Sequence, residues 1–408
     1  MNLRFVSFVL IPFAIVLNAA YTYAIGPAPT WQPRQLVAPN VNLGLHVGAD
    51  RILAFDHYGD PGIAYALASP DTWLMYARYV PGAGWQSSIA DGGNRGAYPS
   101  LAFDRRELPV IGYSSSNLKR QVISTFNGTG WAGQYVDAID EDFSSTGGYN
   151  SLAIDSTGKM AMAYIHALSG QFKYIKDTDG DSSVLDETPQ PVPGGQGYYA
   201  SLAFDPLNRP MIAHYDVSAA DLKFSVLDTG LGWVTTTVDS TGLTGSHLSM
   251  AIDPDNGYPA ISYYDDTVDD LRYAAWNGSS WDKTTIDSAG TVGWYTSLAF
   301  DPADGNPAVS YYDQTNGDLK LAWFNGTTWQ TQPVDSVGNV GVTTSIAFNP
   351  FGNGFPSIVY GDNLNNLYFI EDPPAIVPEP QTVLLLALGG LCASTLRRRQ
   401  RAAQENDR

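Results

Sequence analysis

TSLAFDPADGNPAVSYYDQTNGDLKLAWFNGTTWQTQPVDS, residues 296–336, reads as four short β-strands joined by turns. Ser297–Asp301 alternates small and large side chains with a period of two, as a strand does. Ala308–Asp313 is rich in valine and tyrosine, which suit a pleated and packed surface. Asn-Gly pairs at 316–317 and 325–326 are hairpin signals on either side of a third strand, and a tryptophan opens the fourth.

The first strand of this unit recurs along nearly the whole chain as an anchor. Successive copies begin 48 to 51 residues apart, so the chain holds seven units of steady length. Four strands in a unit of this length are typical of a propeller blade. We therefore predict an all-β fold, a seven-bladed β-propeller of four-stranded blades. The anchors are Ile52–Asp56, Ser100–Asp104, Ser151–Asp155, Ser201–Asp205, Ser249–Asp253, Ser297–Asp301 and Ser345–Asn349.

The two ends of the repeat array complement each other. The seventh unit has three strands but no tryptophan strand before Pro373. At the other end, Thr30–Pro33 (TWQP) resembles Thr328–Thr331 (TWQT), which opens the fourth strand of the sixth unit. An N-terminal strand that completes the last blade would close the ring and remove two exposed sheet edges. We predict such a closed propeller over residues 30–372, and an open or spiral array is the alternative.

Both flanks of the repeats differ in composition from the body. Residues 1–24 combine Arg4, an apolar run and small residues at a cleavage position, which is typical of a secretory signal peptide. Residues 373–408 contain a second apolar run, Val383–Leu396, which predicts a short hydrophobic helix. Both runs are short for a permanent membrane span, although a membrane anchor is the alternative at each end.

The C-terminal segment resembles the PEP-CTERM sorting signal of bacterial exported proteins, because its three parts come in the same order. The resemblance implies a Gram-negative-type bacterium, transient contact with the inner membrane, and cleavage by an exosortase-type membrane protease. It also implies delivery to the cell surface or extracellular matrix, where such proteins accompany exopolysaccharide production. The motif residues are Pro378, Glu379 and Pro380, and the basic tail after the apolar run contains Arg397, Arg398 and Arg399.

The chain is strongly acidic and contains one cysteine. Its 41 Asp+Glu residues outnumber its 22 Lys+Arg residues, which gives a formal net charge of −19. An acidic surface argues against nucleic acid and anionic membranes as partners of the body, and it favours cation binding. Cys392 lies in the C-terminal apolar run, so the exported body has no disulfide and its stability has to come from buried blade faces.

One position, two residues before each anchor, carries an aromatic side chain in five of the seven units. The innermost strand of a blade lines the central channel, so this position falls at one rim of the channel. Tyrosine offers a flat apolar face and one hydroxyl, which suits stacking on sugar rings. We predict binding of extracellular polysaccharide or matrix components there, and packing between blades is the alternative. The residues are Asp50, Tyr98, Tyr149, Tyr199, His247, Tyr295 and Thr343.

Acidic residues end four of the second strands. Because strands that alternate in direction bring these ends to the tyrosine rim, we predict that their carboxylates accept hydrogen bonds from sugar hydroxyls or bind cations. Acids in turns also bond backbone amides, which is the structural alternative. The residues are Asp216, Asp265, Asp313 and Asp362.

The third unit has an acidic turn in place of the Asn-Gly hairpin signal. Calcium takes six to eight oxygen ligands, and closely spaced carboxylates in a tight turn supply several. Asp177, Asp179 and Asp181 therefore predict a calcium site, with a solvated acidic turn as the alternative. The turn loosely resembles the Asp-rich calcium hairpins of some propellers, although Gly180 and Thr188 do not fit an EF-hand loop.

Signals for catalysis are few. Asn277–Trp281 and Asn325–Trp329 resemble the Asp-box of sialidase-type (BNR) propellers without its leading Ser-x-Asp, and the repeats are loosely similar to lectin-like propellers. The arginines are scattered over inequivalent positions, and the five histidines show no metal-ligand spacing. A binding protein is therefore favoured over an enzyme. The alternatives are a propeller-type polysaccharide hydrolase or lyase and a passive structural surface protein.

Overall fold

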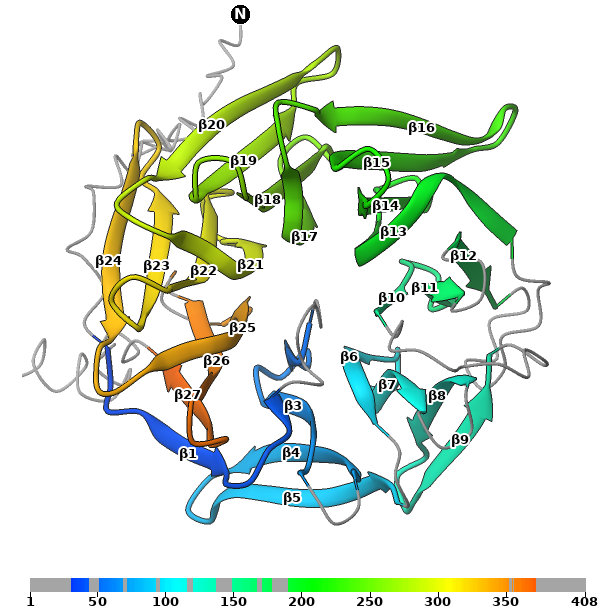
Figure 1. Ribbon diagram of the computed structural model, residues 1–408. Coiled ribbons are helices and arrows are strands. Elements are labelled where there is room, and N and C mark those ends of the chain that lie inside the picture. The colour runs from blue at the N-terminus through cyan, green and yellow to red at the C-terminus, as the bar shows by residue number, and fades with distance from the viewer. Residues whose placement is uncertain are drawn as a thin grey trace, which may run out of the picture.

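The computed structural model describes residues 31–43, 51–68, 72–92, 96–115, 120–136, 149–166, 171–177, 190–351, 354 and 356–371. These residues form a ring of seven blades around a central axis (Figure 1). Within them, no segment forms a helix with the length and hydrophobicity that crossing a bilayer requires. The predicted signal peptide, the C-terminal segment and most of the acidic turn of the third unit lie outside the described residues.

Each blade is an antiparallel meander whose first strand lies nearest the axis. Blade 1 contains β2 (Leu53–Phe55), β3 (Pro61–Ala66), β4 (Leu74–Val80) and β5 (Gly84–Asp91). Blade 2 contains β6 (Ala97–Phe103), β7 (Pro109–Ser115), β8 (Arg120–Phe126) and β9 (Trp131–Tyr135). Blade 5 contains β17 (Thr244–Ile252), β18 (Pro259–Asp265), β19 (Asp270–Trp276) and β20 (Trp281–Asp287). Blade 6 contains β21 (Val292–Phe300), β22 (Pro307–Asp313), β23 (Asp318–Phe324) and β24 (Trp329–Asp335).

Blades 3 and 4 share one strand and therefore form a single seven-stranded sheet. The start of β13 pairs with β12 as the outer strand of blade 3, and the end of β13 pairs with β14 as the inner strand of blade 4. Blade 3 therefore passes into blade 4 along one continuous strand, without a turn between its outer strand and the next inner strand. The strands are β10 (Asn150–Ile154), β11 (Met160–His166), β12 (Gln171–Lys176), β13 (Gln190–Phe204), β14 (Pro210–Asp216), β15 (Asp221–Asp228) and β16 (Gly232–Asp239).

An N-terminal strand closes the ring, as predicted. Blade 7 contains β25 (Val340–Phe348), β26 (Pro356–Asp362) and β27 (Leu367–Glu371), and β1 (Gln35–Ala38) pairs antiparallel with β27 as the fourth strand (Figure 1). Trp31 itself precedes the strand. It packs against the core cluster between blades 6 and 7, which contains Tyr360. The strand that completes the blade therefore begins at Gln35, four residues after Trp31.

The core consists of seven clusters of buried residues, one at each junction between neighbouring blades. At six junctions, a tryptophan of the outer strand, or just before it, packs against the preceding blade. Because a propeller blade buries both faces against its neighbours, second strands such as β18 are buried along their whole length. The tryptophans are Trp31, Trp85, Trp131, Trp233, Trp281 and Trp329.

The anchor serines link the inner strands of neighbouring blades. The hydroxyl of Ser345 accepts hydrogen bonds from the backbone N–H groups of Ile52 and Leu53, each at 3.2 Å, which joins blade 7 to blade 1. Five other anchor serines accept one N–H from the next blade in the same way. Blade 1 has Ile52 in place of this serine, and there the carbonyl of Arg51 accepts the N–H of Leu101 at 2.8 Å. The other serines are Ser100, Ser151, Ser201, Ser249 and Ser297.

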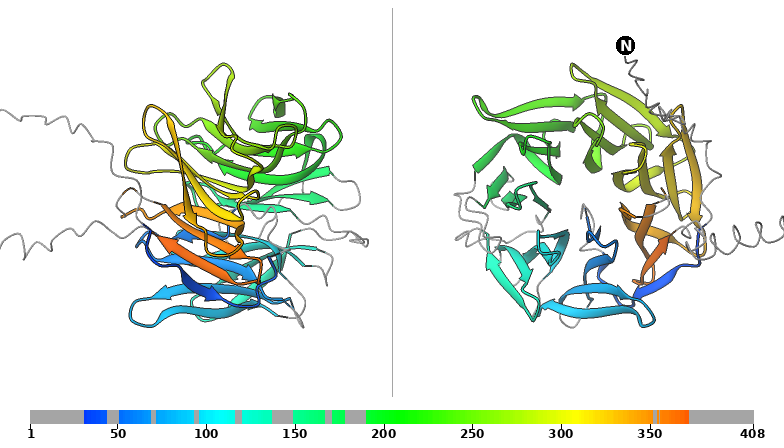
Figure 2. Two further views of the ribbon diagram at one scale, coloured as in Figure 1. Left: turned by 60° about the vertical axis from the view of Figure 1, so that its left-hand side comes forward. Right: turned by 180° about the vertical axis from the view of Figure 1, so that it is seen from behind.

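A second repeated contact joins the blades farther from the axis. The hydroxyl of Tyr263 in β18 donates to Asp239, which ends the outer strand of the preceding blade, at 2.7 Å. Burial opposes ionisation of Asp239, but hydrogen bonds from Thr241, Lys283 and Tyr263 hold its pKa at about 2. The same tyrosine–aspartate pair recurs at three other junctions. Figure 2 shows the ring from an oblique direction and from its opposite face. The other pairs are Tyr113–Asp91, Tyr311–Asp287 and Tyr360–Asp335.

Candidate functional site: an aromatic arc at the channel rim

The five predicted aromatic residues form one continuous structure, which we call the aromatic arc. Its members occupy one repeated position, two residues before the anchor, in or directly before the inner strands of blades 2 to 6, so they lie at the same level of the ring. Neighbouring rings contact one another, with centroid separations of 5.0, 4.9, 4.9 and 4.8 Å along the arc. All five side chains are half-buried. The members are Tyr98, Tyr149, Tyr199, His247 and Tyr295.

The arc stops at blade 7. Thr343 holds the repeated position there and is buried, with 2% exposure. Asp50, at the same position of blade 1, lies outside the described residues. The aromatic surface therefore spans five consecutive blades on one side of the rim.

A local backbone distortion directs most of these side chains. Tyr98, Tyr199, His247 and Tyr295 have φ values of 54°, 56°, 52° and 55°, in the left-handed region that bulky residues rarely adopt. At each of them the pairing register with the second strand shifts. Such bulges re-aim side chains and occur next to binding and active sites. Thr343 of blade 7 has the same conformation, with a φ of 64°, so the distortion belongs to the blade repeat and the side chain that it carries differs between blades.

A glycine permits the bulge in blade 5. Gly245 has a φ of 109°, and a Cβ atom there would lie 2.9 Å from the Cα of Leu222 in blade 4. Glycines at 96, 293 and 341 stand in the same relation to the preceding blade. The repeated glycine thus lets the start of each inner strand approach its neighbour, and the aromatic residue that follows is turned towards the rim.

Further aromatic side chains support the arc from outside. Trp294 stacks on His247 with a centroid distance of 5.3 Å and an interplanar angle of 16°. Tyr198 meets Tyr149 edge-on at 5.6 Å and is 45% exposed. The arc therefore has a second aromatic layer over blades 4 to 6.

The arc is electrically neutral at physiological pH. Burial lowers the pKa of His247 to about 3, so its imidazole carries no charge. Burial also raises the pKa of Tyr149 to about 12 and the pKa of Tyr199 further. The Nε2 atom of His247 lies 3.5 Å from the hydroxyl of Tyr199, whereas its buried Nδ1 has no hydrogen-bond partner among the described residues. The arc thus offers apolar faces and a few polar groups, without formal charge.

The predicted acidic residues share this rim, because each pairs with the start of the inner strand of its own blade. Their carboxylates are buried and bond the turn that follows. Asp265, for example, accepts the N–H of Thr267 at 3.0 Å and pairs with Arg272 at 2.8 Å. Their role as acceptors for a ligand stays a prediction. The other three sites, with the same turn-capping contacts, are Asp216, Asp313 and Asp362.

The predicted calcium turn is described only at its first residue. Asp177 is fully buried and its N–H donates to the carbonyl of Met160 at 2.9 Å, while Asp179 and Asp181 lie outside the described residues. Among the residues that the structure describes, no group of three or more His, Cys, Asp or Glu side chains could hold a metal ion. Calcium binding at this turn stays a prediction.

The channel behind the arc contains a cavity at its opposite end. It has a volume of about 590 Å³ and is lined by inner-strand residues of blades 1 to 5. Arg51 crosses this space, since its Nη2 donates to the carbonyl of Met250 on blade 5 at 3.0 Å. A ligand at the arc would therefore rest on the channel mouth.

Comparisons with known proteins identify the C-terminal segment and the fold. Residues 377–400 match the PEP-CTERM protein-sorting motif, which implies processing by an exosortase, export and sorting to the cell surface. No curated protein matches the chain.

Solved structures similar to the body include a polysaccharide lyase, AofleA and a sialidase. A PL25 ulvan lyase, solved bound to -[GlcA(1-4)Rha3S]-, has a TM-score of 0.57 and 17% identity over 82% of this chain and 95% of its own. AofleA from Arthrobotrys oligospora has a TM-score of 0.46 and 16% identity over 72% and 89%. The NanB sialidase from Streptococcus pneumoniae has a TM-score of 0.44 and 12% identity over 83% and 71%. At these identities the similarity concerns the fold alone.

Proposed function

We propose that the protein is a carbohydrate-binding protein of the bacterial cell surface, which holds a glycan chain on the aromatic arc. The observation that supports this proposal most directly is the unbroken series of ring contacts from Tyr98 to Tyr295. The arc presents half-buried aromatic faces at a spacing that repeats with the blades. Pyranose rings have apolar faces of C–H groups, and a run of such faces matches a run of aromatic rings.

Charge indicates which glycans fit. None of the five arc side chains has a hydrogen bond, ion pair or cation–π contact with a lysine or arginine of the described residues. Carboxylates stand beside the arc on this rim, such as Asp266 beside Tyr199 and Tyr264, and the guanidinium of Arg272 is already paired with Asp265. A uronate or sulfate would meet like charge without a cation to pair with it. The arc therefore favours a neutral polysaccharide.

Binding of neutral oligosaccharides to the purified body tests this function. Tyr149 contacts both Tyr98 and Tyr199 within the arc, so we expect Tyr149→Ala to weaken the best neutral ligand by at least tenfold, about 1.4 kcal/mol, in isothermal titration calorimetry. Tyr58, which is 70% exposed on a turn at the opposite rim, gives the matched control Tyr58→Ala, which should bind as the wild type does. Equal affinities of wild type and Tyr149→Ala would remove the proposal, and so would the lack of any neutral ligand.

A polysaccharide lyase is the second candidate, because Tyr199 and His247 place a hydroxyl 3.5 Å from a neutral imidazole nitrogen. Abstraction of a proton beside a uronate carboxylate also needs a cation to stabilise the developing charge, and the described arc has none. We therefore expect no unsaturated uronate from acidic polysaccharides incubated with the protein. Ultraviolet absorbance by such a product, lost in His247→Ala, would establish the lyase instead.

A further inference from the structure

A second cavity lies between blades 4 and 5, on the rim opposite to the arc. It has a volume of about 440 Å³ and is lined by the turns that follow the inner strands β13 and β17 and by the β19–β20 hairpin. Ligand sites commonly have volumes of about 300–1,000 Å³ and mostly apolar walls with a few polar groups. The cavity has the size and the lining of such a site.

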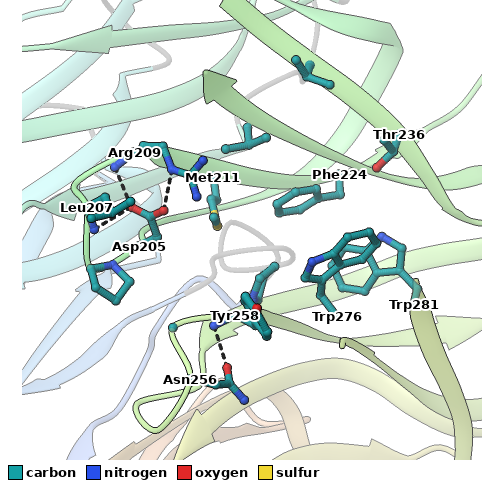
Figure 3. Close-up of a pocket in the computed structure, with 15 residues that line it drawn as sticks. Asp205, Leu207, Arg209, Met211, Phe224, Thr236, Asn256, Tyr258, Trp276 and Trp281 are labelled. Carbon is teal, nitrogen blue, oxygen red and sulfur yellow. Dashed lines mark hydrogen bonds and ion pairs between the residues drawn. The ribbon is translucent and has the colours of Figure 1, made fainter. Parts of the chain in front are cut away.

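Aromatic rings form one side of this cavity. Trp276 and Trp281 meet edge-on, with centroids 5.5 Å apart, and Phe224 of blade 4 packs against Trp281 at 5.2 Å (Figure 3). Tyr258 stands beside them and is 40% exposed, and Leu207 at the mouth is 75% exposed. The cavity thus has an apolar wall that is open to solvent at its mouth.

Polar groups stand at the other end. The Nε of Arg209 donates to Asp205 at 2.7 Å, so the guanidinium charge is already paired. Within the described residues, the Nη atoms of Arg209 have no hydrogen-bond partner. The buried Nε1 of Trp281 has none either, but the equivalent tryptophans Trp85 and Trp233 share this feature, so it belongs to the repeat. Thr236 adds a hydroxyl on the aromatic side of the cavity, near Phe224 and away from Arg209 (Figure 3). The cavity offers N–H donors without net charge.

This combination occurs because the repeats differ at two positions. Tyr258 corresponds to Asn306 in blade 6, and Trp276 corresponds to Leu227 in blade 4 and Phe324 in blade 6. Both large rings thus come from blade 5 and face the shorter turn of blade 4. The neighbouring blades show which smaller side chains the fold accepts at these positions.

We propose that the cavity between blades 4 and 5 binds one neutral pyranose unit, with an apolar sugar face on the Trp276–Tyr258 side and hydroxyls towards Arg209. A purely apolar ligand would leave the buried donors without acceptors, which is unfavourable. An anionic ligand would compete with Asp205 for the guanidinium. A ligand with a flat apolar face and several hydroxyls satisfies both ends. This site is separate from the arc, so the protein would hold glycan on both faces of the ring.

Saturation-transfer NMR on the full-length protein, with methyl pyranosides of glucose, galactose, mannose and rhamnose as probes, tests the site. We expect at least one of them to receive saturation. Trp276→Leu and Tyr258→Asn, which install the residues of neighbouring blades, should weaken that signal at least tenfold in apparent Kd. The matched control Phe324→Leu makes the same kind of change in blade 6 and should leave the signal unchanged.

The arc variant Tyr149→Ala separates this site from the proposed function. Binding of the methyl pyranoside should persist in Tyr149→Ala, because the arc lies on the other face. If Tyr149→Ala abolishes the signal, or if Trp276→Leu and Tyr258→Asn bind like the wild type while remaining folded by circular dichroism, the cavity is not the site. No saturation of any of the four probes in the wild type also overturns the proposal.

Discussion

The aromatic residues of the arc depend on glycines that stand two positions earlier in the chain. In blades 2, 5 and 6, this glycine approaches the preceding blade, and the tyrosine or histidine two positions later has a positive φ. The glycine makes room, and the aromatic residue accepts backbone strain. Because strained residues persist only where the surroundings hold them, the arc is a rigid surface that loses little conformational entropy on binding.

The glycine requirement predicts a graded loss of stability. Gly245→Ala forces both a positive φ and a clash with Leu222, so we expect a loss of about 3 kcal/mol in the free energy of unfolding. Gly128 also has a positive φ, 95°, but nothing lies within 4 Å of its Cβ position. Gly128→Ala should therefore lose only about 1 kcal/mol. Urea denaturation measures both, and equal losses would show that the blade contact is unimportant.

The buried histidine predicts a pH dependence. His247 has a pKa of about 3 when folded and of about 6.5 when unfolded, so the unfolded chain binds the extra proton between these values. Stability should consequently fall as the pH drops below 6.5 and level off near 3 for this group. His247→Phe should remove this dependence of the unfolding free energy on pH. The control His57→Phe, at an exposed histidine, should retain it. Identical slopes of unfolding free energy against pH for wild type and His247→Phe would contradict this assignment.

Neighbouring blades are joined by contacts that no single repeat contains. The anchor serines bond the next inner strand, and tyrosines of the second strands bond aspartates of the preceding outer strand. These pairs explain why each blade stabilises its neighbours and why stability is shared around the ring. They also explain why serine recurs in the anchors and tyrosine recurs near the end of the second strands, because both side chains form bonds between blades.

Loss of an anchor serine therefore weakens a junction. Ser345→Ala leaves two buried N–H groups of blade 1 without an acceptor, which should lower the free energy of unfolding by about 1–3 kcal/mol. Ser114 is also buried but bonds within its own blade, to Gln121, and serves as the comparison. Differential scanning calorimetry should show the larger shift in Tm for Ser345→Ala. An unchanged Tm in that variant would mean that the serine bonds do not hold the blades together.

The strands and their order were predictable because the evidence is local and repeated seven times. The aromatic position was also predictable, since one spacing from each anchor selects it. The contacts between blades were not, because they depend on the register between units that lie 48 to 51 residues apart. The cavity beside Trp276 was not predictable for the same reason, since its walls come from two blades and no motif in either repeat marks it.

At the scale of the whole molecule, the closing strand fixes the ring. Val37, Ala38, Val41 and Leu43 from the N-terminal segment belong to the cluster that joins blades 7 and 1. Without them, β27 becomes an exposed sheet edge and the last junction loses much of its apolar contact. The ring in turn sets the spacing of the aromatic arc, so closure and binding are coupled.

Removal of residues 31–43 tests this coupling. We expect a lower Tm, a tendency to self-associate through the exposed edge of β27, and weaker glycan binding at the arc. A synthetic peptide of residues 31–43 should restore part of the Tm by pairing with that edge. A deletion variant that melts and binds like the wild type would show that the N-terminal strand does not close the ring.

The most direct measurement of the central claim is a crystal structure of the body soaked with the neutral oligosaccharide that binds best. We predict sugar rings stacked on consecutive members of the arc, with Tyr149 and Tyr199 beneath the central units and no sugar passing Arg51 into the channel. An oligosaccharide that binds elsewhere and leaves the arc bare would contradict the account.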